Sequence, residues 1–149
     1  MKKEYESYNH AKVHIRYHLI FSTKFRRDCL NGIKEDLIEC FNDIASHSHF
    51  KILNVGIDRN HVHFFIKSCP TFAVYQIVRR LKQVSTRRMW KKHETYLRQY
   101  YWKKKKLWTN GYFCSTVGEM SEEQFKNILK IKANSYAELK IPHLSQPYC

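Results

Sequence analysis

The 149-residue sequence has few of the residues that usually interrupt a compact fold, with only four glycines and three prolines. It has no Gly/Ser-rich or Pro-rich linker and no internal repeat, which predicts one domain over residues 1–149 with an irregular tail from about residue 140. No run of about 18 apolar residues is present, so we expect no membrane span. The amino-terminal lysines precede no apolar stretch, so a signal peptide is not indicated. These absences favour a cytoplasmic protein.

Closely spaced cysteines are also lacking. The five cysteines are odd in number and widely separated, with no CxxC pair: Cys29, Cys40, Cys69, Cys114 and Cys149. This spacing argues against both a zinc ribbon and a disulfide scaffold. We expect reduced, mostly buried thiols.

Acidic residues are scarce, with 13 Asp and Glu against 27 Lys and Arg, and the net charge is +14. Because such an excess usually serves an anionic partner and a membrane is not indicated, nucleic acid is the leading candidate partner. The alternative is a basic protein that its charge keeps soluble. A hydrophobic fraction of 43% and an aromatic fraction of 15% argue against a disordered chain.

Hydrophobic periodicity predicts an alternation of strands and helices. The expected elements are a strand over 13–21, a helix over 30–47, strands over 50–57 and 61–67, a helix opened by Pro70 and Thr71, a strand over 107–117 interrupted near Gly111, and a last helix from the capping box of Ser121 and Gln124 to about Leu139. The first six elements predict an α+β, ferredoxin-like fold (βαββαβ), a four-stranded antiparallel sheet with two helices on one face. A C-terminal helix follows.

The sharpest chemical signal is the pair His61 and His63 inside the third expected strand. Alternation sends both imidazoles to one face of the strand and Val62 to the other, so the two rings lie side by side, as joint ligation of a metal ion requires. The alternative is two solvent-facing histidines. A second pair, His47 and His49, falls at the end of an expected helix, where side chains two residues apart diverge, and predicts no site.

The segment NHVHFFI, with RYHLIFSTKFRR upstream and LWTNGYFCSTVG downstream, resembles the TnpA-type single-tyrosine HUH transposases of small bacterial insertion sequences, over about residues 12–125. The resemblance implies that His61 and His63 hold a divalent metal, Mg or Mn. It further implies cleavage and rejoining of single-stranded hairpin DNA at element ends through a phosphotyrosine, without a nucleotide cofactor. It also implies a homodimer in which the fourth strands of two subunits pair and the tyrosine helix acts across the interface.

The last expected helix departs from the family. The family's tyrosine position is Ile128 here, and its glutamine position, a third metal ligand, is Lys132. Isoleucine is no nucleophile, and a lysine ammonium has no lone pair for a metal. Tyr136 lies on the same helical face, about 12 Å further along the axis, and is the candidate catalytic tyrosine. The alternative is a catalytically inactive descendant that binds hairpin DNA or RNA.

Basic residues form two groups that predict nucleic-acid contacts. The first group follows the first strand, where the family keeps a similar basic patch, and consists of Lys24, Arg26 and Arg27. The second group lies on the second helix and consists of Arg79, Arg80, Lys82, Arg87 and Arg88. Lys132 of the last expected helix is a further candidate for a phosphate contact. Residues 103–106, all lysines beside Tyr100, Tyr101 and Trp102, suit phosphate contact and base stacking. The alternative for these basic residues is that they lie on solvated helix faces.

A further alternative for the whole domain is an RNA-recognition-type module, since NGYFCSTV resembles the aromatic strand motif of such modules. The histidine pair would then have no role.

Overall fold

The structure of the protein is a computed structural model that describes residues 5–8 and 10–118. The chain divides into two units, residues 1–116 and 117–149, and the fold below is that of the first. The expected last helix lies outside the described residues, and with it Ile128, Lys132 and Tyr136. A single domain over the whole chain stays a prediction. None of the helices in the described segments is long and apolar enough to cross a membrane.

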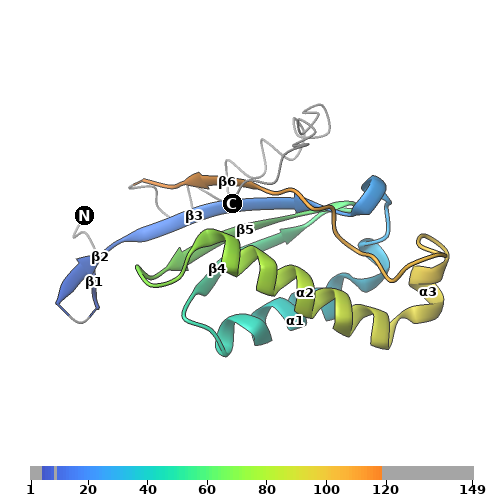
Figure 1. Ribbon diagram of the computed structural model, residues 1–149, viewed down its shortest axis with the longest axis horizontal. Helices are drawn as coiled ribbons and strands as arrows, with labels where there is room; N and C mark the ends of the chain where they lie inside the picture. The colour runs from blue at the N-terminus through green and yellow to red at the C-terminus, as the bar shows by residue number, and fades with distance from the viewer. Residues whose placement is uncertain (1–4, 9, 119–149) are drawn as a thin grey trace. The chain divides into compact units, whose positions relative to one another are not determined.

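Four strands form one antiparallel sheet: β3 (Ile15–Ser22), β4 (Lys51–Ile57), β5 (His61–Ser68) and β6 (Phe113–Thr116). Their order is β4-β5-β3-β6, which places β5 and β3 in the centre (Figure 1). Helices α1 (Lys34–Ser46) and α2 (Val74–Lys92) connect β3 to β4 and β5 to β6, and both lie on the same face of the sheet. This confirms the predicted α+β, ferredoxin-like arrangement.

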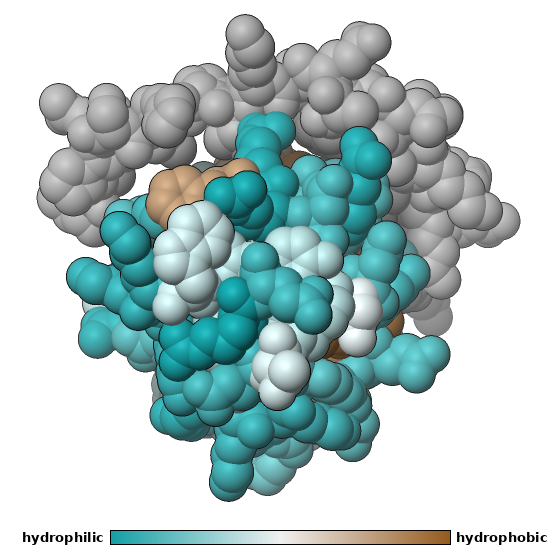
Figure 2. All heavy atoms as spheres, turned by 90° about the vertical axis from the view of Figure 1, so that its right-hand side faces the viewer, coloured by the Kyte–Doolittle hydropathy of each residue, from teal (hydrophilic) through white to brown (hydrophobic). Residues whose placement is uncertain are grey.

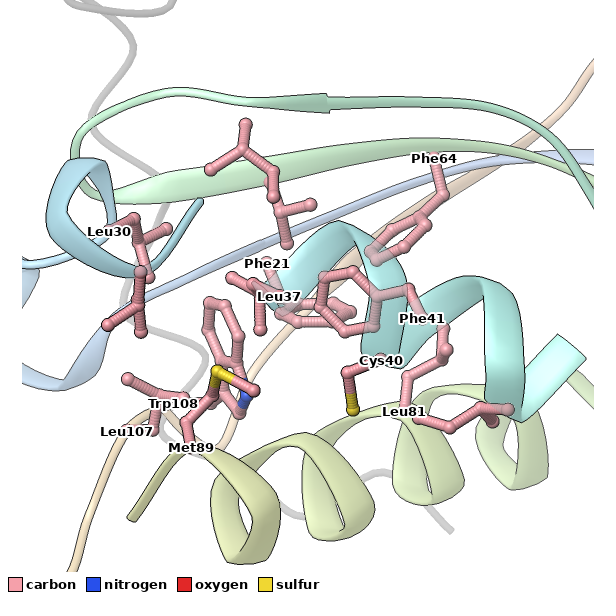
Figure 3. Close-up of a cluster of buried hydrophobic side chains, with 14 of the residues drawn as sticks. Phe21, Leu30, Leu37, Cys40, Phe41, Phe64, Leu81, Met89, Leu107 and Trp108 are labelled. Carbon is pink, nitrogen blue, oxygen red and sulfur yellow. The ribbon is translucent and has the colours of Figure 1, made fainter. Parts of the chain in front are cut away.

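The hydrophobic core lies between the sheet and these two helices. Alternation along the central strands sends Phe21 of β3 and Phe64 of β5 toward the helices, where each is at most 1% exposed. Phe41 of α1 packs edge-on against Phe64, with ring centroids 4.8 Å apart. Figure 3 shows these rings pointing into one cluster with Leu81 of α2 and with Trp108 from the segment before β6. The polar residues of β3 and β5 are thereby directed to the opposite face of the sheet.

Both long helices begin four residues later than predicted, α1 at Lys34 and α2 at Val74. Before α1 the chain forms a short 3-10 turn, η2 (Asn31–Ile33). Before α2, the side chain of Gln76 accepts a hydrogen bond from the backbone N–H of Ala73 at 2.9 Å. This contact caps the helix there rather than at the preceding proline.

The fourth strand is also shorter than the predicted span of residues 107–117, since β6 covers only its second half. Leu107 and Trp108 are buried instead in the core, and Trp108 forms an isolated bridge with Thr23. Leu107 and Trp108, which the sequence predicted to lie in the strand, therefore pack in the hydrophobic core between the sheet and the helices.

Several short elements were not predicted: the hairpin of β1 (Glu6–Tyr8) and β2 (Ala11–Val13), the 3-10 turn η1 (Lys24–Arg26) after β3, and α3 (Glu94–Arg98) after α2. The thiols are as expected. Cys29, Cys40 and Cys69 are free and buried, and Cys114 is free and half-buried. Cys149 lies outside the described residues.

Candidate metal and nucleic-acid site

His61 and His63 lie side by side at the start of β5. In the sheet register, His61 pairs with Ser22 and His63 with Ile20, both of β3. The centroids of the two imidazole rings are 4.7 Å apart, and the ring planes make an angle of 73°. Val62 between them points into the core and is fully buried. The alternation therefore predicted correctly that both imidazoles share the face opposite the helices.

The two rings are mostly buried. His63 is 6% exposed, and the side chain of His61 is 14% exposed. Burial, together with the charges of His61 and His18, lowers the pKa of His63 to about 3. Burial also lowers the pKa of His61, an effect that the carboxylate of Asp58 opposes. Both imidazoles are therefore neutral at neutral pH, and each ring carries one nitrogen with a lone pair.

A hydrogen bond orients the ring of His61. Its Nδ1 donates to Oδ1 of Asn60 at 2.9 Å, so its Nε2 carries the lone pair. Nε2 is buried and accepts no hydrogen bond, and Oδ2 of Asp58 lies 3.8 Å from it. A buried ring nitrogen whose partner nitrogen is fixed by a second residue is the usual arrangement of a metal-binding histidine.

The residues present fit a divalent ion with two imidazole ligands, one from each histidine. Within residues 5–8 and 10–118, no group of three His, Cys, Asp or Glu side chains is arranged to hold a metal ion. In these ranges the fit to a metal ion rests on the two imidazoles alone.

His18 belongs to the same cluster, although the sequence did not single it out as a site residue. Its ring stacks on that of His63, with centroids 5.9 Å apart and planes within 15°. It is 5% exposed and also makes a T-shaped contact with the Phe113 ring in β6, with ring centroids 6.2 Å apart. Alternation places His18 on the polar face of its own strand, but only the pairing register of β3 with β5 brings it to His63.

A basic loop borders the histidine pair. We use this name for residues 24–27, with Arg26 and Arg27 exposed and Lys24 half-buried. The loop follows Thr23, whose backbone N–H donates to the carbonyl of Asn60, next to His61, at 2.9 Å. The positive charges of Arg26 and Arg59 both contribute to the lowered pKa of His61. Exposed cations therefore border the neutral imidazole pair.

Comparison with known proteins identifies the family. Residues 11–130 match the family model described as "Transposase IS200 like", and this span contains the histidine pair and the basic loop. The chain belongs to the IS200-like transposase family.

This IS200-like transposase is 28% identical over 117 residues to the ISDra2 transposase TnpA of Deinococcus radiodurans, covering 78% of the chain and 82% of that protein. It is 22% identical over 147 residues to the transposase for insertion sequence element IS200 of Salmonella typhimurium, covering 96% of the chain and 95% of that protein. The family and these relatives identify a TnpA-type transposase, as the sequence motifs predicted.

Two solved structures share the fold. A transposase crystal structure from Deinococcus radiodurans R1 matches with a TM-score of 0.69 and 25% identity, covering 85% of this chain and 97% of that one. A REP-associated tyrosine transposase bound to a REP hairpin matches with a TM-score of 0.58 and 11% identity, covering 89% of this chain and 73% of that one. The second likeness concerns the fold alone.

Lys82 of this transposase forms hydrogen bonds within the protein. Its Nζ donates to the carbonyl oxygens of Thr109, Asn110 and Gly111 at 2.8, 3.2 and 2.8 Å. Burial lowers the pKa of its ammonium group to about 8. The three N–H bonds of the ammonium group thus tie α2 to the segment before β6, and a phosphate contact from Lys82 stays an untested prediction.

The other basic residues of α2 differ in their partners. Arg88 pairs with Asp43 of α1, and Arg80 donates to the carbonyl oxygen of His47 at 3.2 Å. Arg79 and Arg87 are exposed. All lie on the helical side of the sheet, whereas the basic loop lies beside the histidines, so the two predicted basic groups do not form one patch around the pair.

The residues of the basic-aromatic stretch after α3 also differ in their exposure to solvent. Trp102 is 64% exposed and the four lysines after it are exposed, but Tyr101 is buried and donates from its hydroxyl to the carbonyl of Lys24 at 2.7 Å. Tyr101 therefore holds the basic loop rather than stacking on a ligand. Figure 2 shows this end of the molecule as a mainly hydrophilic surface with a few paler side chains.

Proposed function

We propose that this transposase cleaves and rejoins single-stranded DNA at the ends of an insertion sequence, through a covalent phosphotyrosine link. The observation that carries the proposal is the neutral pair His61 and His63 beside an exposed basic loop. Family membership supports transposition as the overall reaction. The charge of +14 supports a polyanionic substrate.

His61 Nε2 and one nitrogen of His63 are the atoms that we propose as ligands of Mg²⁺ or Mn²⁺. An ion bound there would withdraw charge from the oxygens of the scissile phosphodiester. The side chains of Arg26 and Arg27 bind the neighbouring phosphates and hold the strand against the pair.

The covalent step needs a tyrosine but no nucleotide. The tyrosine oxygen attacks the phosphorus and forms a new P–O bond, while the bond to the 3′ oxygen breaks. The phenolic proton is lost to solvent, and the departing 3′ oxygen takes up a proton. The products are a 5′-phosphotyrosine and a free 3′-hydroxyl. Because one P–O bond replaces another, the energy of the bond is kept for rejoining another DNA end.

Tyr136 is the nucleophile that we propose, since the family's tyrosine position holds Ile128. A phenolic oxygen must come within about 3.5 Å of the phosphorus to attack it. Tyr136 would have to be delivered by a helix displaced by about two turns relative to the family's arrangement.

The second candidate function is binding without cleavage. Both Ile128 and Lys132 depart from the residues that the family's chemistry uses, which favours an inactive descendant that still binds hairpin DNA or RNA. The basic loop serves this function equally well, because phosphate contacts require no nucleophile.

We propose single-stranded hairpin DNA and a second copy of the chain as partners. The REP-associated tyrosine transposase of the same fold was solved with a REP hairpin. In the described part of the chain, β6 pairs with β3 on one side and lies at the edge of the sheet. An edge strand exposes unpaired backbone groups, which the same strand of a second subunit would satisfy.

Incubation with single-stranded hairpin oligonucleotides and manganese tests the proposal, with denaturing electrophoresis to detect a covalent protein–DNA adduct. We expect an adduct from the wild type and none from Tyr136→Phe. No adduct from the wild type, but one from an Ile128→Tyr, Lys132→Gln variant, would establish the inactive descendant. An adduct that survives Tyr136→Phe would assign the nucleophile to another tyrosine.

A further inference from the structure

The backbone of the basic loop adopts an uncommon conformation. Phe25 and Arg26 have φ angles of 58° and 50°, and within the described residues they are the non-glycine positions with positive φ. A left-handed conformation is disfavoured for a bulky L-residue and typically costs about 1–3 kcal/mol. Such strain persists only where the surrounding structure holds it.

Neighbouring groups hold this conformation from both sides. Thr23, which is fully buried, donates from Oγ1 to the carbonyl of Arg27 at 2.8 Å, and its own carbonyl accepts from the Arg26 N–H at 3.0 Å. The Lys24 N–H donates to the carbonyl of Leu107 at 2.8 Å. With the Tyr101 hydroxyl on the Lys24 carbonyl, two residues of the segment between α3 and β6 hold the loop.

The conformation exposes an aromatic ring. Phe25 is 72% exposed, more than Trp102 at 64% or any other large hydrophobic side chain of the described residues. The Lys24 ammonium lies 5.4 Å from the centroid of its ring. A phenylalanine whose purpose was packing would be buried, so the fold holds this ring outward at a cost in backbone energy.

The segment that carries the exposed ring leaves the sheet beside His61. Phe25 is three residues beyond Ser22, which pairs directly with His61 in the sheet, and Thr23 donates to the carbonyl of Asn60. Its sequence neighbours Lys24, Arg26 and Arg27 are all cationic. A strand bound by these cations would therefore lie within reach of the ring and of the histidines.

We propose that Phe25 is a positioning residue that stacks on an unpaired base next to the phosphodiester held at His61 and His63. The inference rests on the proposed function, which supplies the single strand. A single apolar ring among cations suits a nucleic-acid strand, because the cations neutralise phosphates while the ring offers a face to any base. A protein partner would instead bury a broader apolar surface.

Two substitutions separate stacking from folding. Phe25→Ala and Phe25→Gly both remove the ring, but glycine adopts positive φ without cost, so Phe25→Gly should unfold at or above the wild-type denaturant midpoint. Phe25→Trp keeps a stacking face. Tyr75→Ala, which removes a 49% exposed ring of α2, is the matched control.

The probes are a single-stranded oligonucleotide of mixed sequence and an abasic strand of equal length, with binding followed by fluorescence anisotropy. We expect Phe25→Ala and Phe25→Gly to lose about 5- to 150-fold in affinity for the first strand and little for the abasic one. Phe25→Trp and Tyr75→Ala should bind both strands as the wild type does.

Four outcomes overturn the inference. Equal binding of the mixed strand by wild type, Phe25→Ala and Phe25→Gly refutes stacking and leaves the proposed function standing. An equal loss on both strands shows that the ring serves the loop and not a base. No binding of either strand by the wild type refutes the proposed function and the inference together. A mass change in light scattering with unchanged affinity would assign Phe25 to a contact between copies of the chain.

Discussion

The hydroxyl of Tyr101 donates a hydrogen bond to the carbonyl oxygen of Lys24 at 2.7 Å, across 77 residues of sequence. The same hydroxyl lies 3.4 Å from the carbonyl of Leu107. Tyr101 is therefore the buried point at which the segment after α3 holds the basic loop. Burial raises the pKa of its phenol, so the hydroxyl remains a donor throughout the accessible pH range.

Replacement of Tyr101 by phenylalanine should loosen the basic loop. The variant keeps the packed ring but leaves the Lys24 carbonyl without this donor, which costs about 1 kcal/mol of unfolding free energy. We expect a lower denaturant midpoint together with weaker binding of single-stranded DNA. Tyr75→Phe, at an exposed position of α2, is the control, and a Tyr101→Phe protein that matches it in both measurements would contradict this role.

Lys82 should contribute to stability rather than to DNA binding. Lys82→Met keeps most of the apolar stem but removes the ammonium group, which lies 5.3 Å from the centroid of the Phe21 ring and donates to three carbonyl oxygens. We expect a loss of about 1–3 kcal/mol in unfolding free energy, measured by urea denaturation. Arg79→Met removes an exposed charge of the same helix and should change stability little. An unchanged midpoint but weakened DNA binding in Lys82→Met would restore Lys82 to the nucleic-acid surface.

Stability of the metal-free protein should fall with acid through His63. Its pKa is about 3 in the folded state against an ordinary 6.5, so the unfolded chain binds the proton more readily. The stabilising effect is complete above pH 6.5 and is lost as pH falls toward 3, with a slope of at most about 1.4 kcal/mol per pH unit. We expect the unfolding free energy to be about 2 kcal/mol lower at pH about 5 than at pH about 7, with chelator present.

The matched variants for this pH dependence are His63→Gln and His47→Gln. The first removes the buried imidazole and should flatten the profile, whereas the second removes an exposed histidine at the end of α1 and should leave it unchanged. A wild-type profile that is flat over the same range would refute the proton linkage assigned to His63.

Arg26 and Arg27 should account for part of the salt dependence of DNA binding. Each phosphate contact to a single strand contributes about 0.7 to the slope of log affinity against log salt. Arg26→Gln with Arg27→Gln should therefore reduce the slope by about 1.4 if both arginines contact phosphates. Arg88→Gln is the contrast, because Arg88 is already paired with Asp43 of α1. Equal slopes in all three proteins would exclude the basic loop as the phosphate contact.

The sequence predicted the parts of the site that depend on local periodicity. The alternation of residues 61–67 placed His61 and His63 on one face because the side-chain period of a strand is two. The same argument could not bring His18 to His63, since this contact depends on the register between β3 and β5. Nor could it show that the pair is buried, which depends on the surroundings in the folded chain.

Two further features of the site required the structure for other reasons. Phe25 lies in the segment TKFRR, which has no glycine to indicate a left-handed backbone. Lys82 has the spacing of a solvated helix cation, like Arg79, but the carbonyl groups of residues 109–111 surround its ammonium group. Long-range hydrogen bonds of this kind leave no local pattern in a sequence.

The proposed function depends most on a metal site at His61 and His63. Titration of the metal-free protein with manganese, followed by calorimetry and by the EPR signal of free Mn²⁺, measures this directly and requires no catalytic activity. We predict weak, saturable binding to the wild type, since the described residues supply two ligands, and none to the His61→Ala, His63→Ala double variant. Equal heats and equal free manganese for the two proteins would contradict the account.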